Sequence, residues 1–109
     1  MNNTKKTKFE KWLDEANEVC RKQHEAQFDN LTYDPLFYTK GKNYVKIMRK
    51  SGAQTFVWAF VSMVDNPKKN ERVGDLLKPA SWKAPAKHAR GNIFDGTAKY
   101  GQYGPVYMK

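Results

Sequence analysis

The most constraining feature of this sequence is the stretch QTFVWAFVSMV at residues 54–64, which is apolar on both sides of an extended chain. Its β-branched and aromatic residues favour a β-strand, whose alternate side chains point to opposite faces. One face would hold Thr55, Val57, Ala59, Val61 and Met63, and the other Phe56, Trp58 and Phe60. Such a strand lies centrally in a sheet, either covered on both faces or covered on one and exposed to a partner on the other.

Neighbouring segments supply partners for this strand. The segment NYVKIMRK at residues 43–50 alternates Val45 and Ile47 with larger or polar residues, and Ser51-Gly52 follows as a turn. Residues 75–78 can add a third strand, which Pro79 ends. We therefore expect a three-stranded antiparallel meander over residues 43–78, with a fourth short strand open at residues 106–108.

A helix is predicted before the sheet, over residues 7–27. Thr7 and Glu10 have the spacing of a capping box at its start. Apolar residues then recur at helical spacing, at Phe9, Trp12, Leu13, Ala16, Val19, Cys20 and Phe28. We expect this amphipathic helix to pack on the sheet, with a connector at residues 29–42.

The segment after the sheet is rich in basic residues and punctuated by prolines. Ser81 has the character of an N-cap, Pro85 suits the first turn of a helix, and Gly91 suits the position after its end. We expect one short helix near residues 85–90, within a basic corner and tail over residues 79–109. Together these elements predict an α+β fold in a single small domain, residues 1–109.

The net charge of +9 is concentrated in the second part of the chain. Residues 1–37 hold 6 Lys/Arg against 7 Asp/Glu, whereas residues 38–109 hold 14 against 4. Each Lys or Arg that neutralises a phosphate releases a condensed counterion, so a concentration of this kind attracts nucleic acid. Many soluble proteins are basic without such a role, and that alternative stays open.

Several classes of function find no support. No apolar run is long enough to cross a bilayer and no signal peptide is evident, so we expect a soluble intracellular protein without a membrane partner. Cys20 is the only cysteine, and its pairing with His24 is too sparse to predict a metal site. The sequence has no P-loop, nucleophile elbow or dinucleotide loop. We expect no enzymatic activity, no cofactor and no metal.

Two regions combine basic with aromatic residues. In the first, one strand can lie beside the aromatic residues of the next, with Tyr44, Lys46, Met48 and Lys50 beside Phe56, Trp58 and Phe60. Single-stranded nucleic acid is held by bases stacked on aromatic rings while cations follow the phosphates. The alternative is that the three aromatic residues form the floor on which the N-terminal helix packs.

The second region is GDLLKPASWKAPAKHARGN, residues 74–92. If Pro85 begins a helix, its free amides and the nearby cations can meet a phosphate, and Trp82 can stack or anchor. A solvated basic loop is the alternative. The basic residues of this region are Lys78, Lys83, Lys87, His88 and Arg90.

This stretch, with NYVKIMRK and FVWAFV before it, is similar to small hypothetical proteins encoded by tailed bacteriophages. The similarity covers about residues 43–94, and its specific part is the pattern GD-x-L-K-P-A-S-W-K-A-P-A-x-x-x-R-G-N. The resemblance implies a phage origin and a place of action in the cytoplasm of the infected bacterial host. It transfers no activity and no binding residue.

Two hypotheses of function follow. The first is a basic accessory protein that binds single-stranded or structured RNA or DNA through Lys46, Arg49, Lys50, Lys78, Trp82, Lys83, Lys87, His88 and Arg90, with Trp58 as a second stacking residue. The second is a protein-interaction module or inhibitor that acts on a host or defence protein, with Tyr100, Tyr103, Tyr107 and Met108 in its interface. A homodimer is open as well, because an uncovered aromatic strand face would need a partner.

Overall fold

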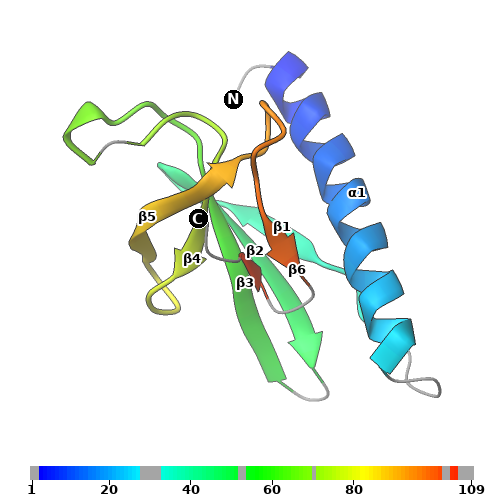
Figure 1. Cartoon of the computed structure of the whole chain (residues 1–109). Helices are drawn as coiled ribbons and strands as arrows, with labels where there is room; N and C mark the ends of the chain where they lie inside the picture. The colour runs from blue at the N-terminus through cyan, green and yellow to red at the C-terminus, as the bar shows by residue number, and fades with distance from the viewer. Residues whose placement is uncertain (1–2, 28–32, 52–53, 70, 102–103, 106–109) are drawn as a thin grey trace.

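The computed structural model describes residues 3–27, 33–51, 54–69, 71–101 and 104–105. Within them, a long helix packs on a five-stranded antiparallel sheet, and a two-stranded ribbon follows (Figure 1). The elements in chain order are α1 (Asn3–Gln27), β1 (Phe37–Lys40), β2 (Tyr44–Ser51), β3 (Gln54–Ser62), the 3-10 helix η1 (Pro67–Lys69), β4 (Asp75–Pro79), β5 (Pro85–Asn92), β6 (Tyr100–Gly101) and β7 (Gly104–Pro105). The sheet order is β1-β2-β3-β4-β5, so each strand pairs with its neighbours in sequence. The predicted α+β class is confirmed, but the three-stranded meander is extended by a strand at each edge.

Helix α1 presents its expected apolar side to the sheet. It begins at Asn3, so Thr7 lies inside it and the predicted capping box is wrong. The residues before Thr7 include neither Gly nor Pro, and nothing in them interrupts the helical hydrogen bonds. Val19 is 37% exposed, whereas the buried residues lie three or four positions apart, at Phe9, Trp12, Leu13, Ala16 and Cys20. Burial raises the pKa of the Cys20 thiol to about 11, which keeps it protonated and unreactive.

A β-bulge in β3 decides which aromatic residues reach the core. Ile47 is opposite Ala59 and Met48 is opposite Val57, so Trp58 is an extra residue between the two pairs. Trp58 and Ala59 both join the core beneath α1, and Trp58 is 1% exposed. Phe60, paired with Lys46, is therefore on the other face of the sheet. The prediction that Phe56, Trp58 and Phe60 share one face is wrong, because strict alternation assumes that no bulge intervenes.

The two-stranded ribbon of β6 and β7, which we call the C-terminal segment, lies between α1 and the sheet (Figure 1). The backbone carbonyl of Gly101 accepts a hydrogen bond from Trp58 Nε1 at 3.2 Å and one from the Cys20 thiol at 3.6 Å. The Tyr100 ring makes edge contacts with Trp12 at 5.5 Å and with Trp58 at 5.7 Å between ring centroids. The core is thus built from three parts of the chain: the helix, the central strands and this segment.

The predicted connector contains an edge strand, β1. Asn17 of α1 positions its start, because Asn17 Oδ1 accepts hydrogen bonds from the Leu36 amide at 2.7 Å and the Tyr33 hydroxyl at 2.9 Å. The chain then runs antiparallel to β2, with Thr39 opposite Lys46. Residues 29–42 are therefore a connector only up to Leu36 in the part that the structure describes.

Residues 85–90 form part of strand β5, so the predicted short helix is wrong. A six-residue helix would make few internal hydrogen bonds, whereas the extended chain pairs with β4 along its length. Pro85 begins the strand opposite Pro79, where neither residue has an amide to donate. Gly91 lies inside β5 with a φ of 98° and does not follow a helix.

The two ends of the GDLLKPASWKAPAKHARGN stretch meet at the base of the β4–β5 hairpin. Asp75 pairs with Asn92, and Asn92 Nδ2 donates to Asp75 Oδ1 at 3.0 Å and to the Val73 carbonyl at 2.9 Å. Asn92 Oδ1 accepts from the Phe94 amide at 2.8 Å. The side chains of Asp75 and Asn92 are both buried. Their hydrogen bond joins the two strands at the base of the hairpin, and Trp82 lies at its tip.

Two further observations complete the fold. The fourth strand expected at residues 106–108 lies outside the described residues. Among the residues that are described, no helix combines the length and the apolar character needed to cross a membrane.

Candidate nucleic-acid interface

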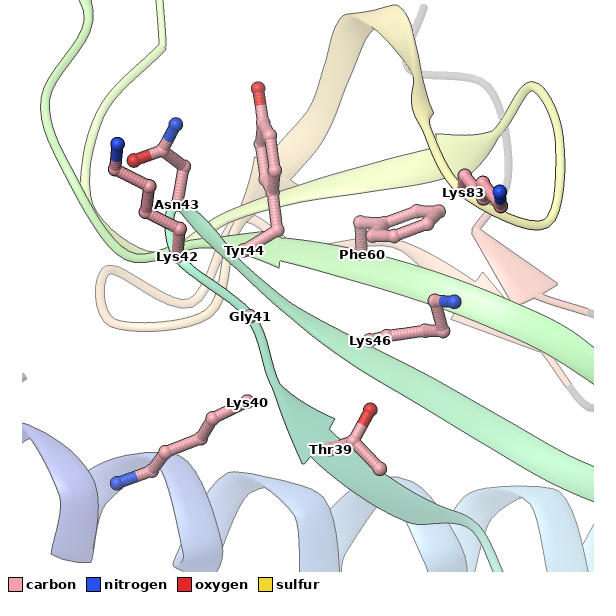
Figure 2. A pocket seen from close by; sticks show the side chains of 9 residues that line it. All are labelled: Thr39, Lys40, Gly41, Lys42, Asn43, Tyr44, Lys46, Phe60 and Lys83. Carbon is pink, nitrogen blue, oxygen red and sulfur yellow. The ribbon is translucent and has the colours of Figure 1, made fainter.

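The face of the sheet opposite α1 holds a hollow of about 380 Å³, which we call the basic hollow (Figure 2). Strands β1, β2 and β3, the β1–β2 turn and the β4–β5 turn all contribute to it. Its lining residues are Thr39, Lys40, Gly41, Lys42, Asn43, Tyr44, Lys46, Phe60 and Lys83. Four of these are lysines and none is acidic, so the lining is cationic.

Figure 2 shows how the side chains around the basic hollow lie. The Phe60 ring lies between Tyr44 on one side and Lys83 on the other, and Lys46 extends from β2 on the side of Lys83. Lys42 lies beyond Tyr44, whereas Lys40 points toward α1. Phe60 is only 2% exposed, so it forms the floor of the hollow and offers no free ring face. The accessible groups are the ammonium ends of Lys42, Lys46 and Lys83 and the edge of Tyr44.

Tyr44 is held in place by a buried carboxylate. Its hydroxyl donates to Glu71 Oε1 at 2.7 Å, and its ring stands edge-on to Phe60 with 6.0 Å between centroids. Burial, followed by this hydrogen bond, raises the pKa of Tyr44 to about 12. Tyr44 therefore stays neutral, and Glu71, which is 5% exposed, does not line the hollow.

The other carboxylates after β3 accept hydrogen bonds from backbone amides. Asp65 accepts from the Val73 amide at 3.0 Å, and Asp75 accepts from the Arg72 amide at 2.8 Å. Asp95 accepts hydrogen bonds from the Thr97 hydroxyl and, at 3.0 Å, from the Thr97 amide, and these two bonds lower the pKa of Asp95. These three carboxylates thus accept hydrogen bonds from backbone amides in turns, and none of them lines the basic hollow.

Trp82 stands beside the basic hollow at the tip of the β4–β5 hairpin. Its side chain is 49% exposed, and Lys46 Nζ lies 4.7 Å from its ring centroid, in a cation–π contact. The tip is fixed by Ser81, whose Oγ accepts from the amides of Lys83 at 3.3 Å and Ala84 at 3.2 Å. Trp82 also lines a second, shallower depression of about 340 Å³, which we call the apolar groove, with Thr55, Phe56, Val57, Pro79, Ala80 and Ser81.

Comparison with known proteins places the chain in a family. Residues 3–103 match a family of unknown function (DUF7717), which covers nearly the whole chain. The chain belongs to this DUF7717 family. No curated protein and no solved structure matches it.

The structure of this DUF7717 chain brings three of the predicted site residues together. Lys46 and Lys83 line the basic hollow, and Trp82 lies next to it. Lys50 and Lys78 are exposed, at the end of β2 and on β4, but they line neither depression.

Arg49 and Trp58 are not placed to contact a ligand on this face. Arg49 is 8% exposed, and its guanidinium lies over the rings of Tyr33 at 5.4 Å and Phe56 at 5.5 Å. The bulge in β3 puts Trp58 in the core. The sequence-based assignment of Arg49 to the binding surface is wrong, because it assumed exposure for a charged residue. For Trp58 the alternative interpretation holds, in which this residue is part of the floor beneath α1.

The rest of the predicted basic cluster lies along β5. Arg90 is half-buried, and its carbonyl accepts from the Lys99 amide at 3.0 Å. The backbones of Lys87 and His88 belong to β5, but their side chains lie outside the described ones. These three residues are not at the N-terminus of a helix, so the predicted phosphate site made of helix amides is wrong.

Two lining residues, Lys40 and Lys42, were missed by sequence reasoning. They flank Gly41 in the segment TKGKN, which reads as a turn only if residues 37–40 are recognised as a strand. That strand has four residues and little alternation of apolar and polar residues, so the sequence indicates only weakly that residues 41–43 form a turn between two strands. Among the residues that the structure describes, no group of three or more His, Cys, Asp and Glu side chains is arranged to hold a metal ion.

Proposed function

We propose that the chain binds nucleic acid on the face of the sheet opposite α1, without catalysing a reaction. The observation that carries the proposal is the basic hollow, which is lined by four lysines and no carboxylate. The side chains of Lys42, Lys46 and Lys83 lie around it, whereas Lys40 points toward α1. Such an arrangement attracts a polyanion, and the neighbouring aromatic residues suit a nucleic acid better than a simple anion. From the resemblance to phage proteins, we place this activity in the cytoplasm of an infected bacterium.

The number of lysines sets the expected salt dependence. Single strands lose affinity with a slope of about −0.7 per neutralised phosphate in a plot of log K against log salt. Because Lys40 points toward α1, we expect three or four contacts, and hence a slope of about −2 to −3. A rise from about 50 to 200 mM salt would then weaken binding by about twentyfold to fiftyfold.

The observations favour this proposal over a protein-interaction module. Tyr100, one of the predicted interface residues, is packed against Trp12 and Trp58 in the core. The other three, Tyr103, Tyr107 and Met108, lie outside the described residues. The reason for considering a homodimer is that an uncovered aromatic strand face would need a partner. Trp58 and Phe60 are only 1% and 2% exposed within a single chain, so this reason carries less weight.

The test is a fluorescence-anisotropy titration with labelled single-stranded DNA and RNA of about 15 nucleotides, within the usual site size for such proteins. The variant carries Lys46→Glu and Lys83→Glu, which reverse two charges in the basic hollow. The matched control carries Lys11→Glu and Lys22→Glu on the exposed side of α1, so both proteins have the same net charge. We expect the first pair to weaken binding at least tenfold more than the second.

Equal losses in the two variants would mean that general charge and not this face attracts the nucleic acid. Failure of the wild-type chain to bind either oligonucleotide at about 50 mM salt would refute the proposal altogether. A pull-down of host proteins that resists nuclease and high salt would then become the next experiment. Circular dichroism of each variant checks that the fold is intact.

A further inference from the structure

We infer that Trp82 stacks on an unpaired base, so that the site selects single-stranded over duplex nucleic acid. This inference rests on the proposed function and specifies the ligand of the same face. It depends on where Trp82 stands, on how firmly it is held and on what lies on either side of it.

Among the residues that the structure describes, Trp82 is the most exposed aromatic residue on this face. It is 49% exposed, whereas Phe37 and Phe60 on the same face are 39% and 2% exposed. The other two tryptophans, Trp12 and Trp58, are buried in the core. A base that enters this face therefore finds one accessible indole ring.

The hairpin tip holds Trp82 in position before any ligand arrives. The amides of Ala80 and Ser81 donate to the Ala84 carbonyl at 3.0 and 3.1 Å, and Ser81 Oγ accepts from the amides of Lys83 and Ala84. Pro79 and Pro85 are paired directly below. A ring on a fixed turn loses little conformational freedom when a base stacks on it.

Trp82 lies between two surfaces of different character. On one side, Lys46 and Lys83 border the basic hollow. On the other, Val57 and Pro79 line the apolar groove with Trp82 itself. A nucleotide has the same division, with a charged phosphate and an aromatic base, so its phosphate would lie over the lysines and its base against Trp82.

The dimensions favour an unpaired nucleotide. Depressions of about 340 and 380 Å³ are at the small end of the range for ligand sites, about 300–1,000 Å³. In a duplex the face of each base is covered by its neighbours, and only the edges are open in the grooves. An indole ring can therefore reach a base face only where the base is unpaired.

The experiment compares three labelled probes of equal length: single-stranded DNA, the same strand with abasic sites throughout, and its duplex. The abasic strand keeps the phosphates and lacks the bases, so it separates stacking from charge attraction. The wild-type chain should bind the base-containing strand about tenfold more tightly than either the abasic strand or the duplex, in line with one stacked base. Trp82→Ala should remove this preference and leave the affinity for the abasic strand unchanged.

The conservative variant Trp82→Phe guards against an effect on folding, because it keeps an aromatic ring at the tip. It should retain most of the preference for bases. It should also abolish the quenching of tryptophan fluorescence that the single strand causes in the wild-type chain, since the buried Trp12 and Trp58 remain.

Each outcome has one meaning. Equal affinity of the wild-type chain for base-containing and abasic strands, or for single strand and duplex, would overturn the inference while the proposed function stands. A preference for bases that persists in Trp82→Ala would overturn the role of Trp82. No binding to any of the three probes would refute the proposed function and this inference with it.

Discussion

Gly91 illustrates at the scale of one residue why a sequence pattern can be misread. In the sequence it resembles the glycine that follows a helix, because both positions require a positive φ. In the structure the same requirement arises inside β5, where φ is 98° and a Cβ atom would lie 2.1 Å from the Thr97 carbonyl oxygen. The glycine thus allows the segment around Thr97 to approach the strand.

Substituting Gly91 with alanine should therefore destabilise the fold strongly. Gly96 is the matched control, since its φ is 80° but a Cβ atom there would meet nothing within 4 Å. Gly96→Ala should cost about 1–2 kcal/mol from backbone strain alone. Gly91→Ala should cost more than about 3 kcal/mol, because the clash adds to that strain. Urea denaturation of both variants measures the difference, and equal losses would show that the close approach to Thr97 is absent.

At the scale of the element, the β4–β5 hairpin explains why one stretch holds both the most specific sequence pattern and the exposed tryptophan. Its base is a buried polar cluster around Asp75 and Asn92, and its tip carries Trp82 and Lys83. The residues at the two ends of the pattern, Gly74-Asp75 and Gly91-Asn92, thus stabilise the fold. The residues from Ser81 to Lys83 serve the proposed binding surface.

Removing the Asn92 side chain should loosen the base of this hairpin. Asn92→Ala deletes three hydrogen bonds and leaves the buried Asp75 carboxylate with fewer donors, so we expect a loss of about 2–4 kcal/mol. Asn43→Ala, at an exposed position, should change stability by less than about 0.5 kcal/mol. Chemical denaturation followed by circular dichroism compares them. Similar stabilities of the two variants would contradict a structural role for the Asn92 cluster.

At the scale of the whole molecule, the C-terminal segment joins the helix to the sheet. Tyr100 contacts Trp12 of α1 and Trp58 of β3, and the Gly101 carbonyl bonds to groups on both elements. The face opposite α1 buries Phe60 and Leu77 and also carries exposed lysines and Trp82. The helix and the proposed ligand thus lie on opposite sides of one sheet.

Tyr100→Ala should weaken the attachment of α1 to the sheet. We expect a loss of about 2–3 kcal/mol, whereas Tyr100→Phe keeps the ring contacts and should lose much less. Tryptophan fluorescence and circular dichroism should report one coincident unfolding transition in both variants, because the three parts share a core. A fluorescence transition that precedes the loss of helix would argue against this shared core.

The sequence by itself determined the features that depend on local order. The three- and four-residue spacing from Phe9 to Cys20 specifies the buried side of a helix, and the alternation around Val45 and Ile47 specifies a strand. Both patterns arise from the geometry of one element, so they can be read without knowing its partners. The excess of basic residues after position 37 is likewise a property of composition.

Only the tertiary structure decided the features that depend on pairing between distant segments. The register of β2 against β3 placed the bulge at Trp58 and so separated Trp58 from Phe60. Pairing with β4 made residues 85–90 a strand, although their local signals also suit a helix. The β1–β2 turn and the β4–β5 turn brought Lys42 and Lys83, which are 41 positions apart in the sequence, to one hollow. Local propensities differ by about 1 kcal/mol or less per residue, so long-range hydrogen bonds and burial decide such cases.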